Sequence, residues 1–139
     1  MPLQASFNPK DPRCVFVTGI DIYSYMKIND ANIVKETSFK MTKNDKALFS
    51  NNFLCHTWTD SRILTCTDHG EILVSEDTGD FRHLLHDAPG YNFRIEHILA
   101  IKQEGFIIAD NEGHFQVFEA NSDPKNPFRL SKNLVRSIR

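Results

Sequence analysis

The stretch CTDHGEILVSED, residues 66–77, indicates how this chain folds. A polar turn around Gly70 is followed by a short run of apolar and polar side chains that is typical of a β-strand. A strand on each side of a short polar turn that contains glycine is typical of a hairpin. We therefore predict a β-hairpin at this point.

The same pattern returns further along the chain. Residues 62–77, RILTCTDHGEILVSED, align without a gap with residues 105–120, GFIIADNEGHFQVFEA. The alignment places Gly70 over Gly113, 43 positions later. A shorter copy is visible in CVFVTGIDIYSYMKI, residues 14–28. The sequence therefore indicates three copies of one unit.

A repeat of about 40 to 50 residues is typical of β-propellers and solenoids. Each unit here consists of short β-type runs separated by turn residues, without a stretch of helical periodicity. We therefore predict an all-β protein, a single domain over residues 1–139, made of about three four-stranded antiparallel blades. The blades are expected at about residues 5–42, 52–88 and 95–136.

The expected strands follow from the same runs. They cover residues 5–8, 14–18, 22–28 and 33–40, then 53–59, 62–67, 71–75 and 81–85, and finally 96–102, 106–109, 114–119 and 128–134. Gly70 and Gly113 are expected to adopt positive φ in the hairpin turns, where glycine has no Cβ strain. Asp68 and Asn111 are expected to bond nearby backbone at the start of these turns.

The apolar residues give a candidate core. Trp58 aligns with Ile101 at a strand position, so core packing is favoured over stacking on a ligand. Aromatic residues at strand positions are expected to fill the space between blades: Phe16, Tyr23, Tyr25, Phe93, Phe106, Phe115 and Phe118. The cysteines Cys14, Cys55 and Cys66 have no C-x-x-C spacing and are expected to be buried free thiols of a reducing compartment.

Composition and charge exclude several classes of protein. The 139 residues are 40% hydrophobic and 24% charged, which suits a globular domain with a core. A net charge of −2 does not suit binding to nucleic acid. The sequence contains no long apolar run and does not begin like a secretory signal, so we expect a soluble, intracellular protein that does not bind membranes.

No pattern of catalytic or metal-binding residues stands out. Cys55 and His56 are neighbours on a strand and should point to opposite faces, so we expect a buried cysteine and a histidine at the rim. The histidines His69, His83, His86, His97 and His114, and the acidic residues Glu76, Asp77 and Asp80, are interpreted as surface residues. The basic residues Lys125, Arg129, Lys132, Arg136 and Arg139 are interpreted as protection of an exposed edge strand. We predict no catalytic, cofactor-binding or metal site.

Three blocks of the sequence carry a resemblance to a known family. They are SFNPKDPRCVFVTG at residues 6–19, the block of residues 52–82, and GFIIADNEGHFQVFE at residues 105–119. Together they resemble part of the WD-repeat β-propeller region of the cilia- and flagella-associated proteins of the motile axoneme. The similarity covers roughly residues 5–134, although the tryptophan-aspartate blade endings of WD repeats are absent.

This resemblance implies a partial WD-repeat-like propeller that acts as a non-catalytic scaffold. It implies partners among dynein-arm or microtubule-associated proteins, a cytoskeletal location in the cilium or flagellum, and a role in inner dynein arm assembly and ciliary beating. Two alternatives remain open: a general WD-repeat adaptor outside cilia, and a hydrolase or metal-dependent enzyme on an incomplete propeller. Because three blades leave two terminal faces uncovered, we also expect the isolated chain to self-associate, with Val15, Ile72 and Phe115 among the packing residues.

Overall fold

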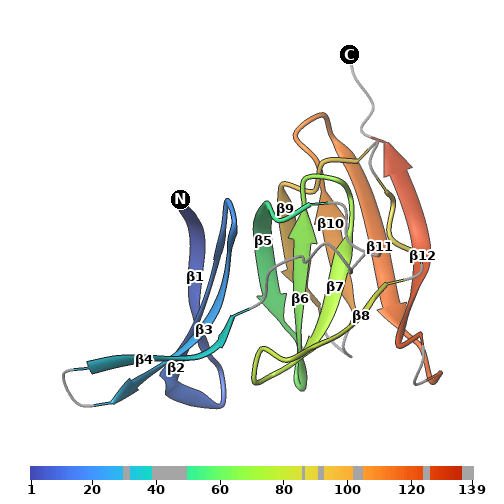
Figure 1. Ribbon diagram of the computed structural model, residues 1–139. Helices are drawn as coiled ribbons and strands as arrows, with labels where there is room; N and C mark the ends of the chain where they lie inside the picture. Colours follow the sequence, from blue (N-terminus) through green and yellow to red (C-terminus); the bar gives the residue numbers. More distant parts are fainter. Residues whose placement is uncertain are drawn as a thin grey trace.

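The computed structural model describes residues 1–29, 32–38, 50–85, 87–90, 93–101, 105–123 and 126–135. Over these residues the protein is all β, and its strands form three antiparallel sheets of four strands each (Figure 1). The described residues include no helix that could cross a membrane.

Each sheet is built from four strands that follow one another in the chain. The first contains β1 (Pro2–Asn8), β2 (Asp11–Gly19), β3 (Ile22–Asn29) and β4 (Asn32–Ser38). The second contains β5 (Phe53–Trp58), β6 (Arg62–Thr67), β7 (Ile72–Glu76) and β8 (Phe81–Leu84). The third contains β9 (His97–Ala100), β10 (Phe106–Ala109), β11 (His114–Ala120) and β12 (Phe128–Val135).

The predicted strands are confirmed, because each lies where the sequence placed it and its ends differ by at most three residues. The predicted ends at residues 39–40 and 102 lie outside the described residues. Gly70 and Gly113 have positive φ angles of 72° and 90°, also as predicted. Local patterns were sufficient here, since strand periodicity and turn glycines act on neighbouring residues.

The second sheet lies between the other two (Figure 1). Neighbouring residues of β6 and β7 are therefore buried in unbroken runs, from Ile63 to Thr67 and from Ile72 to Ser75. Because both faces of these strands are covered, the small polar residues Thr65, Thr67 and Ser75 are buried along with the apolar ones. The first and third sheets each have one face covered and one face uncovered.

Two apolar clusters join the sheets. The cluster between the first and second sheets contains Cys14, Phe16, Tyr23, Tyr25, Phe53, Ile63 and Leu73. The cluster between the second and third sheets contains Cys55, Leu64, Cys66, Ile72, Val74, Leu85, Phe93, Ile95, Phe106, Ile108, Phe118 and Phe128. Trp58 packs against the first cluster, which confirms its predicted role in the core.

Most of the aromatic residues predicted to pack between sheets do so, but Phe115 does not. Phe115 is 39% exposed, because it lies on the face of β11 opposite to the buried Gln116 and Phe118. Val15 likewise lies on the uncovered face of the first sheet, half-buried beside Phe7, whereas Ile72 is fully buried as predicted. Phe93 is buried in the segment between β8 and β9 and does not belong to a strand.

The buried Tyr23 shows how a polar group is accommodated between the sheets. Its hydroxyl lies 2.6 Å from Ser75 Oγ and donates to the carbonyl of Gly79 at 2.7 Å. Burial raises the pKa of Tyr23 to about 12, despite the hydrogen bond with Ser75. The phenol therefore stays protonated and ties the first sheet to the β7–β8 turn.

Candidate functional site

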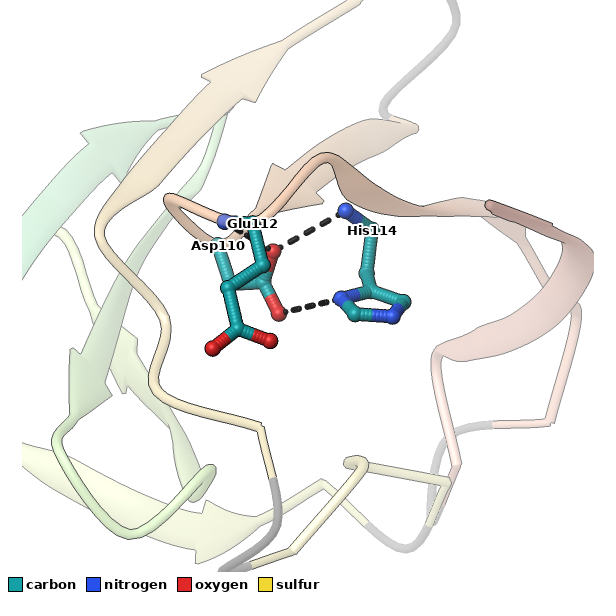
Figure 2. A group of neighbouring side chains, drawn as sticks. All are labelled: Asp110, Glu112 and His114. Atoms are coloured by element: carbon teal, nitrogen blue, oxygen red, sulfur yellow. Dashed lines mark hydrogen bonds and ion pairs between the residues drawn. The ribbon is translucent and has the colours of Figure 1, made fainter. Parts of the chain in front are cut away.

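The turn between β10 and β11 brings Asp110, Glu112 and His114 together (Figure 2). Among the described residues they are the one group of three side chains whose ligand atoms lie close enough to share a metal ion, within 4.8 Å of one another. Two carboxylates and an imidazole are ligands that zinc and similar ions accept. From the sequence, His114 was predicted to be a surface histidine, but the three residues were not predicted to lie together.

Asp110 uses both of its carboxylate oxygens within the turn. Oδ1 accepts hydrogen bonds from the backbone N–H groups of Glu112 and His114, each at 2.9 Å. Oδ2 lies 2.7 Å from Nδ1 of His114. Burial alone would raise the pKa of Asp110, but the hydrogen bonds from the backbone and the ring of His114 lower it below its usual value. The carboxylate is therefore ionised at neutral pH.

The equivalent turn of the second sheet has the same hydrogen-bond pattern. Thr67, 43 positions before Asp110, accepts at Oγ1 from the backbone N–H groups of His69 at 3.3 Å and Glu71 at 3.2 Å. It also donates to the Glu71 carboxylate at 3.0 Å. In both turns, one side chain holds the backbone two and four residues ahead and contacts the side chain four residues ahead. We therefore assign the cluster around Asp110 to closing the turn.

This arrangement corrects the predicted role of Asp68 and Asn111. The backbone bonds come from the residues one position earlier, Thr67 and Asp110. The carboxylate of Asp68 instead accepts hydrogen bonds from the Ser50 hydroxyl and the Asn52 amide, in the segment that leads into the second sheet. The prediction was wrong because a glycine marks a turn without specifying which preceding residue closes it.

We expect Asp110→Ala to lower the free energy of unfolding by about 1 to 2 kcal/mol, because two backbone N–H groups lose their acceptor. Asp110→Asn should cost less, since its amide oxygen can still accept from both groups. Urea unfolding of both variants, with and without a chelator, measures this. If the cost of the alanine variant vanished in the chelator, the cluster would be a metal site and its assignment to the turn would be wrong.

His56 lies in the interior between the first and second sheets, with 1% of its surface exposed, so the predicted position at the rim is wrong. Its Nε2 lies 2.6 Å from Ser6 Oγ, and its Nδ1 lies 2.8 Å from Thr18 Oγ1. The ring also meets Phe16 edge-on, with 4.7 Å between the centroids. Cys55 points the other way, towards the carbonyl of Ile95 in the second apolar cluster, which confirms that the two side chains diverge.

Polar side chains of β1 complete this network. The side-chain amide of Gln4 donates to the carbonyl of His56 at 2.8 Å and accepts from its N–H at 3.0 Å. The indole of Trp58 donates to Ser6 Oγ at 2.8 Å. The interface between the first two sheets is thus partly polar, and the hydrogen bonds of the His56 network hold the sheets in register. His56 is 38 to 52 residues away in the chain from its partners Ser6, Thr18 and Gln4, so no local pattern points to them.

The chemistry of His56 follows from its burial. Burial lowers the pKa of the ring to about 4, so the imidazole is neutral at pH 7. A serine hydroxyl beside a histidine is one half of a nucleophilic pair, which needs a base that accepts a proton near neutral pH. A ring with so low a pKa is a weak base, and its other nitrogen is held by a threonine hydroxyl. The burial and the hydrogen bonds of His56 therefore favour a structural role for this residue.

We expect the free energy of unfolding to fall as the pH drops from about 6.5 to about 4, because the unfolded chain binds a proton at His56 before the folded one does. Neutral His56 contributes fully to the free energy of unfolding at pH values above the pKa that the ring has in the unfolded chain. Roughly 3 kcal/mol of this free energy is lost between pH 6.5 and pH 4. Urea unfolding over that pH range measures the slope.

The control for this prediction is His56→Gln, whose amide can still bond Ser6 but does not titrate. The pKa of His83 is also lowered, by burial and then by Arg62, and its contribution remains in both proteins. An equal slope in the variant and the unchanged protein would contradict the assignment to His56.

Among the described residues, the other histidines and acidic residues named from the sequence do not form a group of possible metal ligands. Glu76 and Asp80 share one turn, in which the N–H of Glu76 donates to the carbonyl of Asp80 at 2.9 Å. His69 contacts Asp68 at 2.9 Å, and His97 is exposed on β9. Glu76 accepts from Arg82 at 2.9 Å, and Asp80 accepts from Thr78 at 2.8 Å. Asp77 is half-buried. Arg129 pairs with Glu119, and Lys132 lies exposed on β12. Four of the residues named from the sequence lie outside the described residues: His86, Lys125, Arg136 and Arg139.

The three cysteines are free and buried, as predicted. Cys55 and Cys66 face each other directly across β5 and β6. Burial, and then the contact with Cys55, raises the pKa of the Cys66 thiol well above its usual value. The thiol therefore stays protonated, which makes it a poor nucleophile.

The uncovered face of the first sheet is apolar, and we refer to it as the first free face. Ala5 pairs with Val17, and Val15 pairs with both Phe7 and Met26, so these side chains are neighbours on one surface. Phe7 is 58% exposed. Among the described residues, its apolar side chains are Leu3, Ala5, Phe7, Val15, Val17 and Met26, and Ser24 lies beside Val17 in the same row.

The uncovered face of the third sheet is largely apolar, and we refer to it as the third free face. One row of paired residues runs through Leu99, Ile107 and Val117 and ends at Lys132, and a second runs from His97 through Ala109 and Phe115 to Leu134. Leu99 is 65% exposed and Leu134 is 50% exposed. An apolar surface of this kind, on two opposite ends of one molecule, is typical of a binding surface.

A comparison of the sequence with protein-family models found no match, and a comparison with curated proteins found none either. Inferences about function therefore rest on the chain's own sequence and structure. The features that bear on it are the internal repeat, the His56 network that joins two sheets, and the two free faces.

Proposed function

We propose that this protein is a non-catalytic protein-binding module made of WD-repeat-like propeller blades. The observation that carries the proposal is the pair of apolar free faces at the two ends of the three-sheet stack. Such faces are buried between neighbours in a closed propeller, and burial of apolar area is the main driving force of protein association. Support also comes from the 43-residue repeat, whose turns share one hydrogen-bond pattern.

Within this class we propose a scaffold of the motile cilium or flagellum. Its partners would be dynein-arm or microtubule-associated proteins of the axoneme, and its role would lie in inner dynein arm assembly and beating. The support is the resemblance of three sequence blocks to the WD-repeat region of axonemal proteins. The runner-up of the same class is a WD-repeat adaptor that acts outside cilia.

Localisation of the tagged chain in multiciliated cells, together with co-purification, tests this placement. We expect the chain at the axoneme, with dynein-arm or microtubule-associated proteins bound to it. Phe115→Asp serves as the matched variant, because it places a charge on a free face at a position that is already 39% exposed. Axonemal localisation should weaken in the variant. A diffuse cytoplasmic signal without axonemal partners would favour the adaptor.

One observation favours a second candidate, a hydrolase. Ser6 Oγ lies 2.6 Å from Nε2 of His56, as in a nucleophile with its base. A fluorophosphonate probe, which labels activated serines, tests this candidate, with Ser6→Ala as the control. We expect no labelling of either protein, because the pKa of His56 is lowered by burial to about 4. Labelling that disappears in Ser6→Ala would overturn the non-catalytic proposal.

A further inference from the structure

The two faces of each sheet have different roles. We define the backward face of a sheet as the one towards the sheet before it in the chain, and the forward face as the one towards the sheet after it. In the second sheet, Ile63 and Leu73 lie on the backward face and pack with the first sheet. Leu64 and Val74, one position later in each strand, lie on the forward face and pack with the third sheet.

The repeat identifies the third free face as a forward face. A shift of 43 positions carries the forward-face residues of the second sheet onto the third sheet: Leu64 onto Ile107, Cys66 onto Ala109, Ile72 onto Phe115, and Val74 onto Val117. All four targets belong to the third free face. Their counterparts in the second sheet are 0% or 1% exposed, because another sheet covers them.

The first free face is a backward face by the same comparison of repeats. In the shorter first copy, Phe16 aligns with Leu64, 48 positions later, and both lie on forward faces. Val15 and Val17 therefore align with Ile63 and Thr65, which point towards the first sheet. A further shift of 43 positions leads to Phe106 and Ile108, which pack against the second sheet. The backward faces of the second and third sheets thus each meet a forward face inside this chain.

We infer that the partner of these faces is a second copy of this chain, bound head to tail, with the third free face of each copy against the first free face of the other. A second copy would continue the packing that the chain already contains. A forward face meets a backward face twice within the chain, between the first and second and between the second and third sheets. The two free faces are the unmatched members of the same kind of pair.

Two such contacts close a dimer of six sheets. A head-to-tail contact leads either to a closed ring or to an open filament. Six sheets lie within the range of about four to eight blades that closed propellers contain. In the dimer all four free faces are covered and none remains for growth. The inference rests on the proposed function in treating the free faces as binding surfaces. It assigns these faces to the second copy, so axonemal proteins would bind the remaining surface of the closed ring.

Single charge substitutions on each face test the inference, with light scattering coupled to size-exclusion chromatography as the measurement. Phe7→Asp and Phe115→Asp change exposed residues of the first and third free faces. The unchanged protein should have twice the mass of one chain. Because each contact uses one face of each kind, either variant alone damages both contacts and should elute as a monomer. Ile20→Asp, at an exposed apolar residue in the β2–β3 turn, should remain a dimer.

Mixing the two variants in equal amounts is the decisive step. A mixed dimer contains one contact between two unchanged faces, so association should partly return. In a symmetric contact between two like faces, mixing would restore nothing and one of the variants alone would stay dimeric, which would overturn the inference. A cooperatively folded monomer in the unchanged protein, or growth into filaments, would also overturn it. A monomer that still binds axonemal proteins would leave the proposed function standing.

Discussion

Gly70→Ala is expected to be among the most destabilising single changes in this protein, with a loss of at least about 3 kcal/mol in the free energy of unfolding. A Cβ at Gly70 would lie 1.7 Å from the carbonyl oxygen and 2.4 Å from the carbonyl carbon of Gly90. These are backbone atoms, so no side-chain rotation relieves the overlap. The positive φ of 72° adds strain of its own.

Gly90→Ala is the matched control for this prediction. Gly90 also has a positive φ, of 82°, but a Cβ there would meet nothing within 4 Å. Its cost should be only the backbone strain of about 1 kcal/mol. Urea unfolding of the two variants separates the cost of the steric overlap from the cost of the backbone strain. Equal costs would contradict the close approach of the Gly70 turn to the loop after the second sheet.

Phe106→Ala should cost about 3 to 5 kcal/mol, because it removes the centre of the cluster between the second and third sheets. The ring is fully buried, stacks on Phe118 with 4.6 Å between centroids, and meets Phe128 edge-on at 5.1 Å. Aromatic contacts of this kind add to the loss of buried area. Thermal and urea unfolding of the variant measure the effect.

Two further variants serve as controls for the stability of Phe106→Ala. Phe106→Leu leaves much of the volume filled, so its cost should be about half that of the alanine variant. Ile20→Ala, at a residue that is 38% exposed, should change stability by about 0.5 kcal/mol or less. A cost below about 1 kcal/mol for Phe106→Ala would show that the third sheet does not pack on the second in solution.

The candidate site could be predicted only in part. His114 stood among the surface histidines, and the repeat places Asp110 over Thr67, a residue that closes the equivalent turn. The sequence does not show that Asp110 rather than Asn111 holds the turn. The choice depends on the residue at which the chain bends, and a shift of that bend by one residue would exchange the two. His56 was expected at the rim, since its partners Ser6 and Thr18 come from another sheet.

Local patterns in the sequence were sufficient for the all-β class, the twelve strands of the described residues and the turn glycines, because strand periodicity and positive φ involve residues that are neighbours in the chain. Packing between sheets depends on contacts between distant residues. Phe115 and Phe118 are three positions apart in one strand and therefore lie on opposite faces, of which the first is free and the second is buried. Which face of a sheet is covered depends on the sheet beside it, and a strand's own residues do not contain that information.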